Sequence, residues 1–272
     1  MLKIKDDEFH LLATYIEEHS GIHLKKEKKT LLVGRLSNML TEMGIDDFTT
    51  YYHYLQNDEE GKELSRLIDK ITTNHTYFMR EAEHFNFFVQ TVLPYLKETI
   101  KNRDLRIWCA ASSSGEEPYT LAILMEEFFK ADLIAWDKKL LATDLSLSVL
   151  EQAKRGIYSS DKIQALPKTW ILTYFDKLKD NSYQVKEKLM NQVAYRRFNL
   201  LEPTYPFKKK FHVIFCRNVM IYFDTPVKEA ILRKLYNSLE PGGYLFIGHS
   251  ESINRESSPF QYIRPAVYRK SE

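Results

Sequence analysis

The chain has 272 residues, of which 44% are hydrophobic and 28% charged, and this suits one large globular domain or two modest ones. Its 39 Lys and Arg residues against 37 Asp and Glu leave a net charge of +2, which excludes a globally basic nucleic-acid coat and a polyacidic tail. The two cysteines exclude a disulfide framework, no apolar run is long enough for a membrane span, and the N-terminus lacks a signal-peptide stretch, so we expect a cytoplasmic protein.

The first part of the chain predicts helices only. Apolar residues recur at helical spacing in four segments between residue 6 and about residue 72, and Gly21 and Gly44 follow two of them as stop signals. We therefore expect a small helical domain of four antiparallel elements over residues 1–75. Residues 76–102 form a connecting segment with helical periodicity at 85–96.

From about residue 103, short apolar runs alternate with helical patterns. Residues 105–110, 140–143, 211–216 and 244–248 predict buried strands. Thr225 as N-cap and Pro226 open a helix whose apolar face extends to Leu239, and residues 241–243 break it. This order predicts an α/β fold with a doubly wound, mostly parallel sheet over residues 103–272, and the long stretch 156–198 predicts an insertion.

The turn after the first predicted strand is a candidate ligand cradle. Residues 110–115 are small, and Glu116 and Glu117 follow in the first turn of a helix. Carboxylates there repel a phosphate and favour a ligand with positive charge or hydroxyl groups, although a simply capped helix start explains the pattern equally well. The glycine pattern of dinucleotide-binding folds and the P-loop lysine are absent from this turn.

Two further clusters follow predicted strands. Asp144 is placed to accept two ribose hydroxyls, or else to cap the next helix, a role that Ser146 could fill instead. Arg217, Asn218 and Tyr222 follow the strand expected beside the first one; the alternatives are a surface ion pair and a core ring. Together these features favour an adenosine cofactor without phosphates, such as S-adenosyl-L-methionine.

Six segments closely resemble the CheR-type chemotaxis receptor methyltransferases: residues 72–81, 114–119, 142–144, 199–201, 216–223 and 248–251. The resemblance runs over nearly the whole chain. It implies a class I, Rossmann-like methyltransferase that converts S-adenosyl-L-methionine to S-adenosyl-L-homocysteine while methylating glutamate side chains on the cytoplasmic helices of chemoreceptors. The alternative is a non-catalytic module that senses S-adenosyl-L-methionine, and the balanced charge disfavours a nucleic-acid methyltransferase.

The resemblance also implies the site residues. Arg80 and Tyr222 match the positions nearest the transferred methyl group, and Glu117 is preferred over Glu116 as a cofactor contact. The implied cofactor contacts are Asn74, Thr76, Arg80, Glu117, Asp144, Asn199, Leu200, Arg217 and Asn218. A glutamate with a pKa near ~4.3 is already an anion at neutral pH, so the reaction needs alignment and not a general base. We predict no catalytic His, Cys or metal ion.

The acceptor helices are acidic, so a basic surface should face them. Residues 25–35 carry a net charge of +4 through Lys25, Lys26, Lys28, Lys29 and Arg35 against Glu27, although a solvated charge run is the equal alternative. Some family members add a small antiparallel subdomain that binds a receptor C-terminal pentapeptide. We place this subdomain near 157–198, with strands at 183–186 and 193–198. Residues 174–183 lack the glycine of those members, so we expect no such tethering. Nothing in the sequence demands more than a monomer, and recruitment to membrane receptor arrays would come through the receptors.

Overall fold

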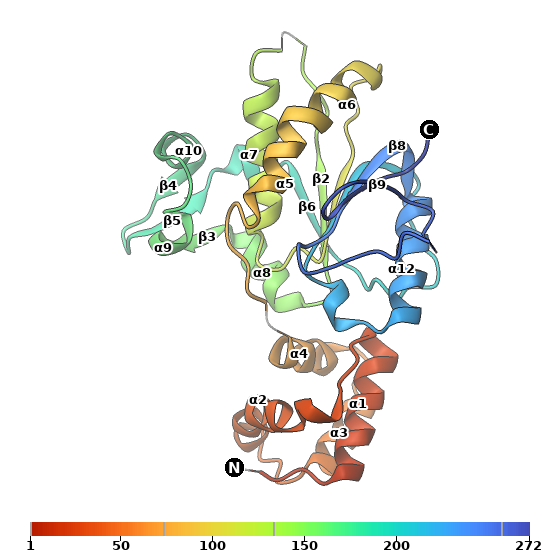
Figure 1. Cartoon of the computed structure of the whole chain (residues 1–272). Helices are drawn as coiled ribbons and strands as arrows, with labels where there is room; N and C mark the ends of the chain where they lie inside the picture. The colour runs from red at the N-terminus through yellow and green to blue at the C-terminus, as the bar shows by residue number, and fades with distance from the viewer. Residues whose placement is uncertain (1, 73, 133, 257) are drawn as a thin grey trace.

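Figure 1 shows the computed structural model of the chain, which describes residues 2–72, 74–132, 134–256 and 258–272. The predicted fold class is confirmed: an all-helical N-terminal part precedes a mostly parallel sheet with helices on both faces, and a small antiparallel sheet projects from one side. No helix in the described ranges combines the length and the apolar character needed to cross a bilayer.

The N-terminal part contains the four helices that the periodicity predicts. They are α1 (Asp6–Ser20), α2 (Lys29–Glu42), α3 (Phe48–Gln56) and α4 (Lys62–Ile71), with a 3₁₀ turn η1 (Lys26–Lys28) before α2. Gly21 ends α1 in the left-handed conformation, with a φ of 72°. Asp47 caps α3, because its side chain accepts a hydrogen bond from the backbone N–H of Thr50. The helices enclose an apolar core of their own, which includes Leu12, Ile16, Leu32, Leu36, Tyr51 and Leu67.

The main sheet has the spatial order β6-β2-β1-β7-β8-β10-β9. Its strands are β1 (Ile107–Ala110), β2 (Leu140–Asp144), β6 (Val193–Arg197), β7 (Phe211–Cys216), β8 (Leu239–Phe246), β9 (Gln261–Arg264) and β10 (Val267–Arg269). The strands from β6 to β8 run parallel, whereas β10 and β9 are antiparallel. Because β2 and β7 lie on opposite sides of β1, the crevice above the carboxyl ends of these strands is the switch point where ligands bind in such sheets.

Helices cover both faces of the main sheet. On one face lie α5 (Ala82–Phe87), the π-helical η2 (Phe88–Val92), α6 (Leu93–Thr99), α7 (Glu116–Phe129) and α8 (Leu147–Arg155), and on the other lies α12 (Thr225–Ser238). Each face of the sheet packs against its helices in a separate apolar core, and successive residues of a strand point to opposite faces. Cys109 and Phe215 face α5 and α7, whereas Trp108 and Ile214 face α12. The turn after β7 is the 3₁₀ helix η3 (Met220–Tyr222).

The small sheet projects beside α7 and α8, where Figure 1 shows it at the left. It consists of β3 (Ile157–Ser159), β4 (Phe175–Lys177) and β5 (Ser182–Val185) in the antiparallel order β3-β5-β4, accompanied by α9 (Ser160–Ile163), α10 (Lys168–Tyr174) and α11 (Glu187–Met190). The strand predicted at 183–186 is therefore present, but the assignment of 193–198 to the subdomain is wrong. That segment is β6, which pairs with β2 from Val193 opposite Leu140. An edge strand of the main sheet buries alternate residues just as a hairpin strand does, so the pattern alone did not distinguish the two.

Two details at the C-terminal side also differ from the prediction. The N-cap of α12 is Asp224, whose side chain accepts from the backbone N–H of Val227, and Thr225 is the first helical residue. The helix α12 ends with Leu239 as its C-cap, before residues 241–243; Leu239 is also the first residue of β8, where it pairs with Phe211, and residues 241–243 continue that strand. The strand tolerates Pro241 there because it lies near the start of β8.

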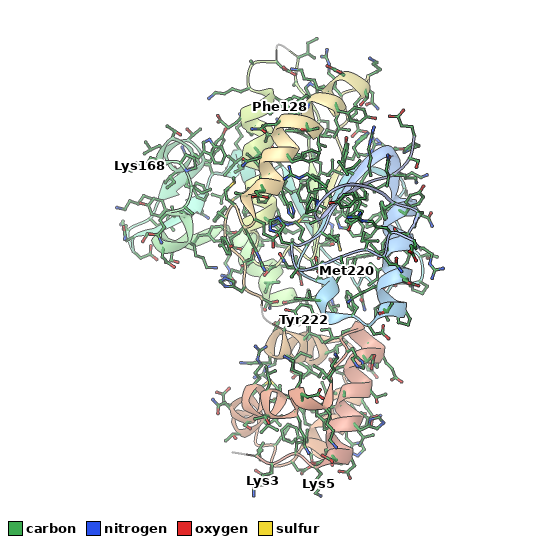
Figure 2. The ribbon with its side chains drawn as sticks, in the orientation of Figure 1. Lys3, Lys5, Phe128, Lys168, Met220 and Tyr222 are labelled. Carbon is green, nitrogen blue, oxygen red and sulfur yellow. The ribbon has the colours of Figure 1, made fainter. Side chains whose placement is uncertain are left out.

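The helical part and the sheet part are in direct contact. The backbone N–H of His23 donates to the carbonyl of Tyr222 at 2.9 Å, and the side chain of Asn199 donates to the carbonyl of His19 at 2.9 Å. Tyr222 and Leu145 pack against the apolar core of the helices, and Figure 2 shows Tyr222 where the two parts meet. The switch-point crevice is therefore covered by the N-terminal helices.

Candidate cofactor and methyl-transfer site

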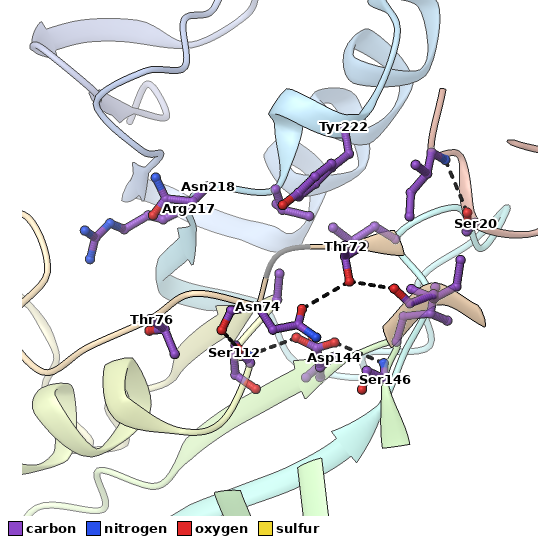
Figure 3. Close-up of a pocket in the computed structure, with 18 of the residues that line it drawn as sticks. Ser20, Thr72, Asn74, Thr76, Ser112, Asp144, Ser146, Arg217, Asn218 and Tyr222 are labelled. Atoms are coloured by element: carbon purple, nitrogen blue, oxygen red, sulfur yellow. Dashed lines mark hydrogen bonds between the residues drawn. The ribbon is translucent and has the colours of Figure 1, made fainter. Parts of the chain in front are cut away.

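A pocket of about 990 Å³, the open solvent at its mouth included, lies over the carboxyl ends of β1, β2 and β7 (Figure 3). Every residue predicted to contact the cofactor or its methyl group lines this pocket: Asn74, Thr76, Arg80, Glu117, Asp144, Asn199, Leu200, Arg217, Asn218 and Tyr222. They come from five separate stretches of the chain, so the fold brings together residues that are up to 148 positions apart (222 − 74). Thr73, part of the resembling motif, lies outside the described residues.

Asp144 is held in place by the backbone on either side of the pocket floor. Its Oδ2 accepts from the N–H of Ser113 at 2.8 Å, and its Oδ1 accepts from the N–H of Ser146 at 3.0 Å. Ser146, and not Asp144, caps α8 by accepting from Val149. Burial raises the pKa of Asp144 above its usual value, although these backbone donors oppose the rise. The capping alternative is thereby removed, and the carboxylate faces the pocket.

The two neighbouring carboxylates at the start of α7 point to different places. Glu117 lines the pocket and pairs with Arg217, Nη1 to Oε2, at 2.7 Å. Glu116 is fully buried away from the pocket, where it pairs with Lys162 at 2.7 Å and accepts from the hydroxyl of Ser114. Of the two, only Glu117 is positioned to meet a ligand in this pocket.

Arg217 and Asn218 form a tightly bonded turn after β7. The side chain of Arg217 is 1% exposed, lies over the ring of Phe85, and donates to Glu117, to Glu81 and to the carbonyl of Arg80. Asn218 has a φ of 58°, and its backbone N–H donates to Glu251 Oε2 at 2.9 Å. This turn is therefore fixed before any ligand binds.

Arg80 reaches the pocket from the segment before α5. Its Nη1 donates to the carbonyl of His75 at 2.6 Å, which holds the guanidinium near the mouth. Met79 and Glu81, its neighbours in sequence, both adopt positive φ values, of 62° and 58°. Such backbone is uncommon for residues other than glycine and is typical of functional sites.

Sequence reasoning missed the part of the lining that the N-terminal helices supply. Ser20 and Ile22 from the end of α1, and Ile68 and Thr72 from the end of α4, line the same pocket. Ile68 continues the apolar face of its helix, so its position in the sequence carries no sign of a ligand. Ser112 and Ser113, from the turn predicted as a ligand cradle, also line the pocket, and the hydroxyl of Ser112 is buried and has no hydrogen-bond partner among the described residues.

The structure does not bring the basic residues near α2 into the pocket. Lys26 and Lys29 both pair with Asp6, at 3.2 and 2.5 Å, on the outer surface of the helical part. Lys25 and Lys28 are exposed beside them. Arg35 instead caps α4, because its Nη1 donates to the carbonyls of residues 70, 71 and 72 at 3.2, 2.7 and 2.8 Å.

Two cysteines and one imidazole near the site are buried, whereas His249 is exposed. Cys109 and Cys216 are free and lie on the neighbouring strands β1 and β7. Glu81, His84 and His249, which the sequence spacing did not connect, place potential metal-ligand atoms within 4.8 Å of one another. Burial and then the charge of Arg217 lower the pKa of His84 to about 3, so this ring is neutral at pH 7.

Comparisons with known proteins found similar sequences over nearly the whole chain. A family model described as "CheR methyltransferase, all-alpha domain" matches residues 7–72, and one described as "CheR methyltransferase, SAM binding domain" matches residues 74–268. The chemotaxis protein methyltransferase of Borreliella burgdorferi is 43% identical, covering 99% of this chain and 96% of that protein. That of Salmonella typhimurium is 35% identical over 100% of this chain and 92% of its own length. The solved structure of PKMT2 from Rickettsia typhi in complex with AdoHcy has a TM-score of 0.34 and 19% identity over 53% of this chain and 21% of that one.

Proposed function

Because the chain belongs to the CheR family of chemotaxis protein methyltransferases, we propose that it forms methyl esters on glutamate side chains of chemoreceptor cytoplasmic helices. Its cofactor is S-adenosyl-L-methionine, in keeping with the SAM-binding family model over residues 74–268. The observation that carries the glutamate proposal is that a single pocket presents both the Asp144 carboxylate and the Arg80 guanidinium.

The pocket residues fit a nucleoside that carries hydroxyls and positive charge. The two oxygens of a carboxylate offer about four acceptor positions, and backbone N–H groups occupy one on each oxygen of Asp144. The remaining positions would receive the two ribose hydroxyls. Glu117 would face the amino group of the methionine moiety, whose charge complements it. When bound, the cofactor supplies an electrophilic methyl group on a sulfonium.

The acceptor glutamate needs positioning and not deprotonation, since its carboxyl is ionised at neutral pH with a pKa near ~4.3. Arg80 would hold one oxygen of this carboxylate as a charge-assisted donor and leave the other oxygen free to attack. Tyr222 lines the pocket where the helices meet the sheet and would fix the acceptor with its hydroxyl. Closure of the pocket by the helical part would strip water from the reacting groups.

Tritium transfer from labelled cofactor to receptor-containing membranes tests this proposal. We expect label that alkali releases as methanol, whereas base-stable label would contradict a carboxyl ester. Arg80→Ala should reduce transfer by about 10²-fold or more, since alignment is the main contribution to catalysis here. Arg233→Ala, on the exposed surface of α12, is the matched control and should be fully active. Cofactor binding without any transfer by the unmodified protein would favour the sensing module.

We assign substrate docking to the helical residues 1–75 and the methyltransferase domain to residues 103–272, and the connecting segment 76–102 contributes Arg80 to the pocket. Lys25, Lys26, Lys28 and Lys29 would face the acidic receptor helices, whereas Arg35 is committed to α4. Lys25→Glu with Lys28→Glu should raise the KM for receptor and leave kcat unchanged. An unchanged KM would contradict the docking assignment.

We do not expect the small antiparallel sheet to bind the C-terminal tail of a receptor. Its β4–β5 turn contains Asn181 in the left-handed conformation, with a φ of 62°, and residues 174–183 lack the glycine that the pentapeptide-binding members carry in this region. We expect the chain to work as a monomer and to bind a receptor C-terminal pentapeptide weakly or not at all. Micromolar affinity of such a peptide in calorimetry would contradict this.

A further inference from the structure

The backbone around Arg80 needs outside support. Arg80 lies between Met79 and Glu81, and both of these residues have positive φ values. This conformation is unfavourable for residues other than glycine, so it persists only where neighbouring groups hold it. The position of the Arg80 side chain in the pocket therefore depends on the contacts that secure residues 79–81.

Glu81 makes the most extensive of these contacts. Its Oε1 accepts from Asn218 Nδ2 at 3.1 Å, and its Oε2 accepts from Arg217 Nη2 at 3.1 Å and from the backbone N–H of His249 at 3.1 Å. These donors lie after β7 and after β8, so one carboxylate joins three separate stretches of the chain. Burial alone would raise the pKa of Glu81, but hydrogen bonding from Asn218 and the charge of Arg217 outweigh it, and the pKa is lowered.

We propose that Glu81 is a positioning residue for methyl transfer: its ionised carboxylate fastens the strained Arg80 segment to the Arg217–Asn218 turn. This inference rests on the proposed function of the pocket. Glu81 is not itself among the residues that line the pocket, so it acts through Arg80, Arg217 and Asn218. Arg217 strengthens the link from the other direction, since its Nη2 also donates to the carbonyl of Arg80.

The same cluster is poorly suited to hold a metal ion, although Glu81, His84 and His249 lie close together. Both carboxylate oxygens of Glu81 already accept hydrogen bonds, and the cationic guanidinium of Arg217 lies 3.1 Å from Oε2. A metal cation would have to displace that guanidinium and would then be repelled by it. The His84 ring, with Nδ1 3.5 Å from Glu81 Oε2, instead packs beside the carboxylate and keeps water away from it.

Glu251 also holds the backbone of the Arg217–Asn218 turn. A replacement of Glu81 should therefore change the position of Arg80 without unfolding this turn. Glu251 Oε2 accepts from the backbone N–H groups of Asn218 and Gly248, at 2.9 and 2.5 Å. When Glu81 is altered, the turn keeps this support and Arg217 keeps Glu117. What is lost is the carboxylate's part of the connection between the turn and the Arg80 segment, and only the hydrogen bond from Arg217 Nη2 to the carbonyl of Arg80 remains of those described here.

Glu81→Gln tests the proposal. Arg217, Asn218 and the backbone of His249 all donate to the oxygens of Glu81, so an amide NH₂ must face at least one donor and the connection is weakened. We expect kcat to fall about 10- to 100-fold, as a misplacement of about 1 Å can cause, and the Kd for S-adenosyl-L-homocysteine in calorimetry to rise less than about tenfold. Glu83→Gln, whose side chain is 74% exposed on α5, is the matched control and should behave as wild type.

Rates are expressed per site that binds S-adenosyl-L-homocysteine, so that unfolded protein does not count. A Glu81→Gln protein with wild-type kcat per binding site would overturn the proposal, even if its melting temperature were lower. If that variant does not fold, Glu81→Asp keeps the charge opposite Arg217 but shortens the side chain; we expect it also to lose turnover, and a wild-type kcat would again overturn the proposal. A wild-type enzyme that binds the nucleoside but forms no base-labile ester would instead refute the proposed function.

Discussion

Replacement of Asp144 by Asn changes the group proposed to bind the ribose while leaving its size the same. The carboxylate uses one acceptor position on each oxygen for Ser113 and Ser146, at 2.8 and 3.0 Å, and offers the others to the ribose. An Asn side chain has one oxygen, so one ribose hydroxyl loses its acceptor. The other hydroxyl keeps an acceptor, but a neutral amide oxygen replaces the charged carboxylate oxygen. A hydrogen bond to a charged group contributes about 1.5–3 kcal/mol. A net loss of about 2–3 kcal/mol corresponds to a rise in Kd of about 30- to 150-fold.

Calorimetric titration with S-adenosyl-L-homocysteine measures this loss directly. Asp161→Asn, an exposed residue of α9 outside the pocket lining, is the matched control and should bind as wild type. The melting temperature should change little, because removal of a half-buried charge offsets the lost backbone hydrogen bonds. If Asp144→Asn binds the nucleoside as tightly as wild type does, the ribose does not lie at Asp144 and the orientation proposed for the cofactor is wrong.

The pH dependence of the same equilibrium provides an independent check. Because burial raises the pKa of Asp144, the folded protein binds this proton more tightly than the unfolded chain does. The ionised form therefore costs stability above the folded pKa, and that cost disappears as the pH falls. Ribose hydroxyls donate more strongly to the ionised carboxylate than to the protonated carboxyl, so affinity for the nucleoside should decrease as the pH falls through the pKa of Asp144. In Asp144→Asn this acid-side decrease should be absent; if it persists unchanged, another group causes it.

Three further changes probe other parts of the structure. Gly248→Ala should weaken nucleoside binding and lower the melting temperature, because a Cβ there would overlap the side chain of Asn218 and lie 3.0 Å from its backbone nitrogen. Gly34→Ala, in open space on α2, should instead stabilise the protein by about 0.5–1 kcal/mol in thermal unfolding. Arg35→Ala should cost about 1–3 kcal/mol in urea unfolding, since α4 loses its cap; an unchanged midpoint would contradict this role. Cys109 should resist iodoacetamide at about pH 8 until the protein unfolds, because burial raises its pKa, and labelling of the native protein seen by mass spectrometry would refute this.

The sequence predicted those helices and strands whose local pattern of apolar residues matches the way they are buried in the folded protein. Helical periodicity identified α1 to α4, and short apolar runs identified β1, β2 and β7, because strands buried on both faces are apolar throughout. The assignment of β6 failed since the segment at 193–197 is an edge strand, and its partner is decided by packing far away in sequence. The end of α12 was predicted too late for a related reason: Leu239 continues the apolar face of the helix, but it is the C-cap and the first residue of β8.

Some residues of the site could likewise be predicted from the sequence, and others could not. Asp144 and Arg217 could be placed in the crevice from the sequence because each follows a strand whose carboxyl end must reach that edge of the sheet. The contributions of Ser20 and Ile68 could not, since they depend on how the helical part docks on the sheet. The sequence also left Glu116 and Glu117 equivalent, and only the rotation of α7 separates a buried partner of Lys162 from a residue of the pocket.

The burial of a site residue determines whether its replacement tests its role in methyl transfer or mainly its role in folding. The guanidinium of Arg217 is 1% exposed and is balanced by Glu81 and Glu117, so its removal would leave two carboxylates facing each other in a buried space. Removing one partner of a buried ion pair costs about 3–5 kcal/mol, which is comparable to the whole stability of many domains. Loss of activity in an Arg217 variant would therefore say little about its contact with the cofactor. Arg80 is only partly buried and its guanidinium donates to the carbonyl of His75, so its replacement removes a group from the pocket without that cost to folding. The methyl-transfer proposal consequently depends on the behaviour of Arg80 variants, and the support that holds Arg80 in place is best tested at Glu81.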